Sequence, residues 1–468
     1  MMEMPISFDV RGRLLEDNEL AAWLAEHSLG NRFGLAVQAD SARQPRAPKA
    51  SALAIVAADG DGRYIDTARL TEDDEAALAA WLGDPGPPKA VHDAKLVAHA
   101  LARCGWALRG ITSDTASAAY LLCPEQPNLS LNELLVRYMR CSLPLEDTEA
   151  AGQYLILQAC AVLDLADVLD EELARIDSSS LFSRITLPVV RVLSEMEIAG
   201  IAVDRAKLDA ASADAAQLRD SAASYGRIHR TFGLADAAPY DGPNLREVFV
   251  AGDGYAELMT ARYPAIEARV IAQLSDDAGL IGVLNAGEDP YRALASYVFP
   301  LSTDELTSQL RRRVELMCYE STARTEAEDH DFWRDLGEYL RAVVDDARRI
   351  GYCSTLLGRR RYLPDLASGS RQVREAAERT ALSVLVGGSA ADIMKVAMIN
   401  VHRVIQDAGL KSRMLLQVGG ELVLEVADGE RETLAAHLGE QMRGAYPLHA
   451  PLEVLIGCGS DWGTATRS

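Results

Sequence analysis

The polar residues with the clearest capacity for chemistry border two apolar segments in the second half of the chain. Residues 414–426 read MLLQVGGELVLEV, in which Gly419 and Gly420 join two apolar runs and Glu421 follows the turn directly. Two strand-like runs separated by a Gly-Gly pair predict a tight β-hairpin. Glu421 places one carboxylate beside this turn. A lone carboxylate cannot hold two hard divalent cations, because each ion needs several oxygen ligands.

The second segment, residues 255–271, reads YAELMTARYPAIEARVI and predicts a strand. The polar residues that would line a cleft here are Arg262, Tyr263, Glu267 and Arg269. A cleft with convergent Arg and Glu side chains is a plausible ligand site, although no nucleophile and base pair is visible in it. Arg262 stays protonated and would repel a metal ion. The alternative is a solvated arginine at a strand end, and the sequence leaves both interpretations open.

An arginine-rich segment lies between these two. Residues 310–320 read LRRRVELMCYE, which combines Arg311 and Arg312 with the aromatic Tyr319. Glu315 lies four residues after Arg311, and its charge would repel a triphosphate. The alternative is an exposed helical charge that pairs with one of the two arginines, a contact worth a few tenths of a kcal/mol.

A second arginine cluster lies further along, where residues 358–364 read GRRRYLP. Arg359, Arg360 and Arg361 could contact the phosphate backbone of a nucleic acid, because such contacts supply most non-specific affinity. The alternative is a solvated cluster that balances nearby acidic residues. These three arginines are the candidate nucleic-acid contacts.

The hairpin segment closely resembles motif C of the family A DNA polymerases, the bacterial DNA polymerase I group. In that family the turn reads His-Asp-Glu and the Asp holds the catalytic magnesium ions. The corresponding residues here are Gly419, Gly420 and Glu421. Residues 262–269, RYPAIEAR, resemble motif A, whose metal-binding Asp corresponds to Arg262. Two metals held by two such carboxylates drive nucleotidyl transfer, so the resemblance implies a catalytically degenerate homologue.

The other polar segments extend this resemblance. In the family's fingers helix, a Lys and an aromatic residue serve the triphosphate, and the corresponding residues are Glu315 and Tyr319. Arg311 matches the family. The helical segment that contains Ser383 and Gly387 resembles the long palm helices, where the family has an Asn and a Gln that contact DNA. Framework positions therefore match, whereas positions that the family uses for metal, triphosphate or DNA are altered.

The first part of the chain is predicted to be an α/β domain. Its expected strands are residues 33–37, 52–57 and 63–65, and its expected helices are residues 72–82, 94–102, 114–122, 131–138 and 154–175. The stretches VHDAKLVAHALARCGW and GITSDTASAAYLL resemble the 3′–5′ exonuclease-like domain of actinobacterial DNA polymerase I. An active exonuclease needs carboxylates around two metals about 4 Å apart. The corresponding residues are Ala36, Gln38, Val97 and Cys160, which predicts a structural role for this domain.

The resemblance implies a fold of α/β and α+β class in two domains. Residues 1–180 are expected to form an RNase H-like, degenerate 3′–5′ exonuclease-type domain. Residues 181–468 are expected to form a reduced polymerase domain with an antiparallel sheet and long helices. Only 21 residues separate Asp204 from Gly226, about one helix at 1.5 Å per residue. The thumb is therefore predicted to be missing and the fingers shortened.

Composition and charge bear on the expected partners and cellular location of the chain. The chain has 468 residues, is 49% hydrophobic and carries a formal net charge of −22. A strongly acidic chain is less expected to bind DNA, because non-specific affinity comes mostly from Lys and Arg that neutralise phosphates. A local basic groove can still occur in such a chain. The seven cysteines contain no C-x-x-C pair, which fits a reducing cytoplasm. The N-terminus does not resemble a signal peptide, and no run of about 18 apolar residues predicts a membrane span.

Three functions follow from these observations. The first is a non-catalytic binding or scaffold protein, a pseudoenzyme derived from a DNA polymerase. The second is a small-molecule or non-polymerase enzyme site in the former palm cleft. The third is residual DNA polymerase activity. We expect no cofactor, with magnesium binding lost. The expected partners are weakly bound DNA, a protein partner or a small-molecule ligand, and no membrane.

Overall fold

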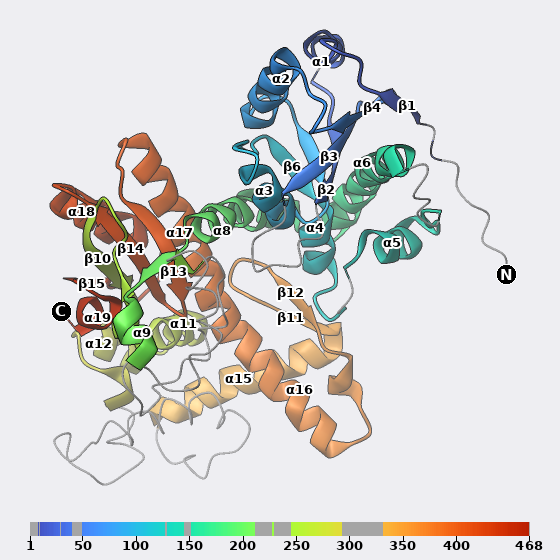
Figure 1. Cartoon of the computed structure of the whole chain (residues 1–468). Coiled ribbons are helices and arrows are strands. Elements are labelled where there is room, and N and C mark those ends of the chain that lie inside the picture. Colours follow the sequence, from blue (N-terminus) through green and yellow to red (C-terminus); the bar gives the residue numbers. More distant parts are fainter. Residues whose placement is uncertain are drawn as a thin grey trace. The chain divides into compact units, whose positions relative to one another are not determined.

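The computed structural model describes residues 8, 10–28, 30–39, 49–126, 129–144, 151–210, 227–228, 245–292 and 331–467. It divides into two compact units, Met1–Ile198 and Ala199–Ser468, which Figure 1 shows coloured by sequence. Arg311, Glu315 and Tyr319 lie outside the described residues. Most of the segments in which the thumb deletion and the shortened fingers were predicted also lie outside them.

A six-stranded mixed sheet forms the centre of unit 1. Its strands in spatial order are β1 (Arg11–Leu14), β4 (Asp61–Asp66), β3 (Ala50–Val56), β2 (Phe33–Ala39), β5 (Lys89–Val91) and β6 (Ile111–Asp114). The three strands β2, β3 and β4 pair antiparallel, whereas β1 with β4, β2 with β5 and β5 with β6 pair parallel. The three strands predicted from apolar runs are confirmed.

Helices cover both faces of this sheet (Figure 1). The helices of this part of the chain are α1 (Leu20–His27), α2 (Glu72–Gly83), α3 (Ala94–Ala102), α4 (Thr115–Leu122), α5 (Leu131–Leu134), α6 (Ala151–Arg175), α7 (Ser179–Leu181) and α8 (Leu187–Ala199). Residues of α1, α2 and α3 pack into one apolar core with alternate residues of the strands. Residues of α6 pack into a second core on the opposite face. The α/β class is therefore confirmed.

Small residues on the strands let α6 approach the sheet closely. A Cβ atom on Gly34 would lie 2.1 Å from the backbone oxygen of Ala159 in α6, so only glycine fits at this position. Ala36 and Cys160 contribute to the same apolar core. Val97 belongs to the core on the other face, and Gln38 is exposed. Val97 therefore lies on the opposite side of the sheet from Ala36 and Cys160.

Local side chains explain where two helices begin. Thr71 precedes α2, and its hydroxyl accepts a hydrogen bond from the Asp74 amide at 3.2 Å, the usual N-cap arrangement. Asp114 was predicted to be the first helical residue, but it ends β6 and precedes α4. Its carboxylate accepts a hydrogen bond from the Ser117 hydroxyl of α4 at 2.5 Å. The helix predicted over residues 131–138 changes to a π-helix after Leu134.

A four-stranded antiparallel sheet forms the centre of unit 2. Its order is β13 (Arg413–Val418), β14 (Glu421–Ala427), β10 (Tyr255–Arg262) and β15 (Leu455–Gly459). Gly419 and Gly420 form the two-residue turn between β13 and β14, and Gly419 has a positive φ of 54°. Tight hairpin turns require such a backbone conformation, which glycine adopts without strain. The predicted hairpin and antiparallel sheet are confirmed.

Smaller strands and helices complete unit 2. They are β7 (Ile201–Val203), β8 (Arg227–Ile228), β9 (Phe249–Val250), β11 (Tyr352–Ser354), β12 (Arg360–Tyr362), α9 (Arg205–Ala210), α11 (Ile266–Ser275), α12 (Ala278–Asn285), α15 (Asp331–Ile350), α16 (Arg371–Ser383), α17 (Ser389–Asp407), α18 (Arg431–Arg443) and α19 (Trp462–Arg467). A π-helical turn, Val384–Gly388, joins α16 to α17. The predicted long helices are confirmed.

The two faces of the larger sheet contact different helices. The Thr260 hydroxyl of β10 donates to the Ala465 carbonyl of α19, and Trp462 packs beside Leu258 and Val423. Side chains alternate between faces along a strand, so residues an odd number apart from Thr260 face the other way. On that face α17 and α18 pack on each other and on the strands.

Two described helical stretches are long and apolar enough to cross a membrane by length and composition alone. These are Gly152–Arg175 and Arg371–Asp407, in which 56% and 61% of the apolar window is buried inside the protein. Core helices of globular domains have the same character.

Candidate functional site

The carboxylate beside the hairpin turn is buried and fully engaged. Glu421 is 6% exposed, and its carboxylate forms an ion pair with Arg246 at 3.1 Å. It also accepts hydrogen bonds from the Thr466 hydroxyl at 3.0 Å and from the Trp462 indole nitrogen at 3.3 Å. The Arg246 guanidinium lies 4.4 Å from the centre of the Trp462 ring. We call Arg246, Glu421, Trp462 and Thr466 the Glu421 network.

Arg262 lies directly across the sheet from Glu421. The two residues are paired in the register of β10 and β14, and directly opposed residues point to the same face. Their side chains therefore share the face that carries α19. Among the described residues, however, the ion pair of Glu421 is formed by Arg246 and not by Arg262. The guanidinium that pairs with Glu421 therefore comes from Arg246, which lies on a different segment of the chain.

The other buried carboxylate of the hairpin is also engaged. Glu425 is fully buried and pairs with Arg413 at 2.6 Å, and it accepts from the Gly252 amide at 3.1 Å. No group of three or more His, Cys, Asp or Glu residues in the described part of the chain could hold a metal ion. The described residues around the hairpin therefore do not form a donor set that fits a magnesium ion.

Two of the predicted ligand-pocket residues are used within the fold. Tyr263 is buried, its hydroxyl donates to the Met442 carbonyl at 2.7 Å, and burial raises its pKa well above the usual value. Arg269 is 3% exposed, forms an ion pair with Glu453 at 3.0 Å and donates to the carbonyl of Pro451. These contacts give both side chains a structural role.

Glu267, a third predicted ligand-pocket residue, lies in the first turn of α11 and is half-buried. A carboxylate in the first turn of a helix is stabilised by the partial positive charge of the unpaired backbone amides there. The remaining three predicted pocket residues, on the fingers segment, lie outside the described residues. Their assignment stays a prediction.

The three candidate nucleic-acid contacts separate into different environments. Arg359 donates from Nε to the carboxylate of Asp392 at 2.9 Å, and Asp392 is 0% exposed. Asp392 also accepts from the Thr355 hydroxyl at 2.8 Å and pairs with Lys395 at 3.2 Å. Burial lowers the pKa of Lys395, and Asp392 opposes that shift. Arg359 is therefore a structural residue.

Arg360 and Arg361 belong to the short hairpin of β11 and β12. The Arg360 guanidinium lies 4.7 Å from the centre of the Tyr352 ring, and both arginines are half-buried. Consecutive strand residues point to opposite faces, so the two guanidinium groups lie on different sides of this hairpin. Arg360 and Arg361 remain candidate DNA contacts.

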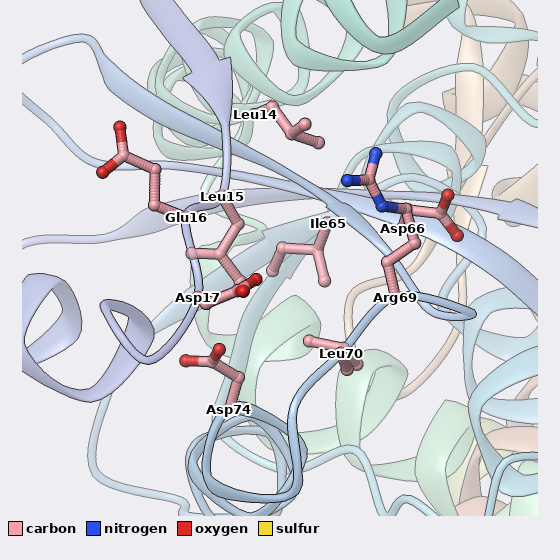
Figure 2. A pocket seen from close by; sticks show the side chains of 9 residues that line it. All are labelled: Leu14, Leu15, Glu16, Asp17, Ile65, Asp66, Arg69, Leu70 and Asp74. Atoms are coloured by element: carbon pink, nitrogen blue, oxygen red, sulfur yellow. The ribbon is translucent and has the colours of Figure 1, made fainter.

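A small cavity in unit 1 contains several carboxylates, shown in Figure 2. Its volume is about 30 Å³, room for a single water molecule. Its most buried carboxylate, Asp74, accepts hydrogen bonds from the amides of Asn18 and Leu20 at 2.7 and 3.1 Å, and from the Thr71 hydroxyl at 2.8 Å. Asp74 thus joins the start of α1 to the start of α2, which is a structural function.

Comparison with known proteins places these features in a family. The model of the DNA polymerase family A matches residues 236–322 and 329–464, and that of the DNA polymerase I ribonuclease H-like domain matches residues 45–147. DNA polymerase I of Mycobacterium tuberculosis (strain H37Rv) is 43% identical over 598 residues, covering 99% of this chain and 66% of the relative. DNA polymerase I of Mycobacterium leprae is 41% identical with the same coverage.

The POL domain of Pol1 from M. smegmatis, solved in complex with DNA primer-template and dNTP, superposes with a TM-score of 0.88 at 46% identity. The match covers 97% of this chain and 100% of that domain. This chain belongs to the family A DNA polymerases. The recognition of an actinobacterial-type DNA polymerase I and the RNase H-like fold of unit 1 are confirmed. The chain spans 66% of the mycobacterial relatives.

Family membership corrects one expectation from the sequence. We expected no cofactor, with magnesium binding lost, and this expectation is wrong because family A DNA polymerases use magnesium ions. The prediction rested on two residue positions, Arg262 and Gly420, and a family assignment over 99% of the chain outweighs them.

Sequence reasoning missed most of the Glu421 network. Arg246, Trp462 and Thr466 were not singled out, because Arg246 precedes Glu421 by 175 residues and Thr466 follows it by 45. The apolar run after Glu421 does indicate that its carboxylate is buried, and a buried carboxylate needs a cationic partner. Nothing in the sequence distinguished Arg246 from the other arginines as that partner.

Proposed function

We propose that this chain binds primer-template DNA through its family A polymerase framework. The observation that carries the proposal is its likeness to the M. smegmatis POL domain, solved with DNA primer-template and dNTP, over 97% of this chain at 46% identity. A likeness of this extent supports a retained polymerase framework in this chain. The net charge of −22 requires that affinity come from local basic groups.

Arg360 and Arg361 are the described residues we assign to phosphate contact. Both lie on the β11–β12 hairpin, and neither forms the buried Asp392 pair that engages Arg359. Each phosphate contact contributes about one unit to the slope of log affinity against log salt. The two side chains therefore contribute a measurable fraction of the electrostatic affinity.

The proposal is tested by fluorescence anisotropy with a labelled primer-template at several salt concentrations. We expect affinity to fall steeply with salt, and Arg360→Ala and Arg361→Ala each to reduce the slope by about one. Arg175→Ala is the matched control, because Arg175 is an exposed arginine of unit 1 with a helical ion pair. Absence of binding at micromolar protein would overturn the proposal.

Two finer forms of this function are distinguishable. Template-directed nucleotidyl transfer is favoured by membership of the polymerase family. Non-catalytic binding, the pseudoenzyme interpretation, is supported by Gly420 and Arg262 at the motif positions and by the engagement of Glu421 with Arg246. We rank transfer first, because family membership covers the whole chain whereas the second argument rests on a few residues.

Primer extension with magnesium and deoxynucleotides separates the two forms. Extension that falls in parallel with DNA affinity in Arg360→Ala and Arg361→Ala would establish transfer by this chain, because a contaminating polymerase would be unaffected by these substitutions. Tight binding without extension would establish the non-catalytic form. A small-molecule function of the palm cleft, the boundary at residues 180 and 181, a protein partner and a cytoplasmic location stay predictions.

A further inference from the structure

Arg262, the last residue of β10, is half-buried, yet its guanidinium forms no hydrogen bond or ion pair within the described residues. Three other arginines of unit 2, Arg246, Arg269 and Arg359, each pair with a carboxylate. A guanidinium stays protonated in proteins, and a partly buried charge that has lost water needs a compensating partner. Arg262 therefore keeps its hydrogen-bonding capacity for a group that the described residues do not supply.

The carboxylate opposite Arg262 already has its cation. Arg262 and Glu421 are directly paired across β10 and β14, a distance that a long arginine side chain can span. However, Oε2 of Glu421 pairs with Arg246 at 3.1 Å, and Oε1 accepts from Thr466 at 3.0 Å and from Trp462 at 3.3 Å. Two guanidinium groups and one carboxylate thus leave one positive charge uncompensated at this end of the sheet.

The surroundings of this charge are open on two sides. On the neighbouring strand β15, the residue paired with Arg262 is Leu455, which is 46% exposed. On the β14 side, the hairpin turn carries no side chains, and a Cβ atom on Gly419 would meet nothing within 4 Å. The Tyr263 amide donates to the Gly420 carbonyl at 3.0 Å and fixes this turn beside the end of β10. Glycine allows a ligand to approach the backbone closely.

We propose that Arg262 binds a phosphate group at the tip of the β13–β14 hairpin. The planar guanidinium presents its N–H donors as a fork that matches two phosphate oxygens, and the uncompensated charge favours an anion over a neutral ligand. The phosphate belongs either to a nucleic-acid backbone or to a free phosphorylated molecule. The nucleic-acid form rests on the DNA binding proposed above, whereas the other form is independent of it.

The first probe is a labelled primer-template, titrated by fluorescence anisotropy over a series of salt concentrations in the presence of a chelator. Arg262→Gln removes the charge and keeps a polar side chain. We expect it to reduce the slope of log affinity against log salt by about one, because each neutralised phosphate contributes about that much. Arg262→Lys should keep the slope, because its ammonium also neutralises one phosphate. A purely structural arginine would leave the slope unchanged in both variants.

The second probe is inorganic pyrophosphate, titrated into the full chain by calorimetry. We expect Arg262→Gln to weaken its binding by about tenfold or more, because a charge-assisted bidentate contact is lost. Arg403→Gln is the matched control, because Arg403 is exposed on α17 in the same unit and its loss changes net charge equally. An equal effect of both substitutions on both probes would show a general charge effect and overturn the assignment.

The two probes together identify the source of the phosphate. A change in Arg262→Gln with the primer-template alone supports a backbone contact, and a change with pyrophosphate alone supports a free phosphorylated ligand. Unchanged binding of both probes would overturn this proposal, while DNA binding by the unmodified chain would still stand. Absence of DNA binding by the unmodified chain would instead overturn the proposed function, and pyrophosphate alone would then decide the role of Arg262.

Thermal melting of each variant separates binding from folding. Arg262 has no partner to lose within the described residues, so we expect Arg262→Gln to melt within a few degrees of the unmodified chain. If Arg262→Gln does not fold, Arg262→Lys provides the test, because lysine keeps the charge but cannot form the bidentate contact. Arg262→Lys should then bind pyrophosphate about threefold or more weakly, and equal affinity would overturn the proposal.

Discussion

Removal of Arg246 should show how far the stability of the four-stranded sheet of unit 2 depends on the Glu421 network. Arg246→Ala leaves Glu421, which is 6% exposed, without its cation. Breaking a buried ion pair by removing one partner costs about 3–5 kcal/mol. The Arg246 side chain is 32% exposed, so water screens part of the interaction, and we expect about 2–3 kcal/mol. This is a large share of a typical unfolding free energy of 5–15 kcal/mol.

Two further variants separate the charge from the packing. Arg246→Met keeps an apolar chain over the Trp462 ring and should recover about 0.5–1 kcal/mol of the loss. Glu421→Gln removes the carboxylate charge, so that loss of Arg246 no longer leaves a buried anion. The double variant Arg246→Ala/Glu421→Gln should therefore be less destabilised than the sum of the single variants by about 1–2 kcal/mol.

Urea unfolding and hydrogen exchange measure these effects together. A loss of 2 kcal/mol in α19 corresponds to about 30-fold faster exchange of its protected amides. Exchange in unit 1 serves as the internal control, because no residue of the Glu421 network belongs to that unit. A coupling free energy below about 0.5 kcal/mol between the two substitutions would refute the argument that Arg246 compensates the buried carboxylate.

Three further predictions concern buried groups elsewhere. Arg359→Ala should lower the unfolding free energy by about 2–4 kcal/mol, because Asp392 is 0% exposed and keeps only partial compensation; a change below 1 kcal/mol in urea unfolding would contradict this. Gly34→Ala should lower the melting temperature by several degrees, because the new Cβ would lie 2.1 Å from the Ala159 carbonyl; an unchanged melting temperature would show that α6 moves freely. The folded pKa of Asp114, about 6 against an ordinary 3.8, means that the folded state binds more protons between these values, so stability falls as pH rises through this window. Asp114→Asn should therefore stabilise the chain at pH 7, by at most about 3 kcal/mol, and not at pH 3; equal effects at both pH values would contradict the assignment.

The elements themselves followed from local sequence. The hairpin of β13 and β14 was predicted from two apolar runs and the Gly419–Gly420 turn, because turn geometry depends on the residues within the turn. Helix α2 begins where an N-cap threonine precedes an acidic first turn. The helix after Leu131 differs from its prediction, because it becomes a π-helix within one turn. A change from the α-helical to the π-helical pattern of backbone hydrogen bonds is not indicated by any clear local sequence pattern.

The sequence by itself also determined the family. Motif-like segments spread over both units retained enough identity for recognition, and the comparisons confirm it. Individual positions were a weaker guide than the whole chain, since Arg262 and Gly420 led to the wrong expectation about magnesium. The residue at one motif position indicates only whether that side chain can bind a metal ion. A cofactor site depends on all the ligands that the fold brings together.

Tertiary structure alone decided which charged groups meet. Glu421 pairs with Arg246 and not with Arg262, which lies opposite it in the sheet. Arg359 is held by Asp392, whereas its neighbours Arg360 and Arg361 are not. Asp114 is buried at the end of β6, where it accepts a hydrogen bond from Ser117. Secondary structure depends on neighbours within a few residues, but the partner of a buried charge is set by strand order and helix packing over long separations.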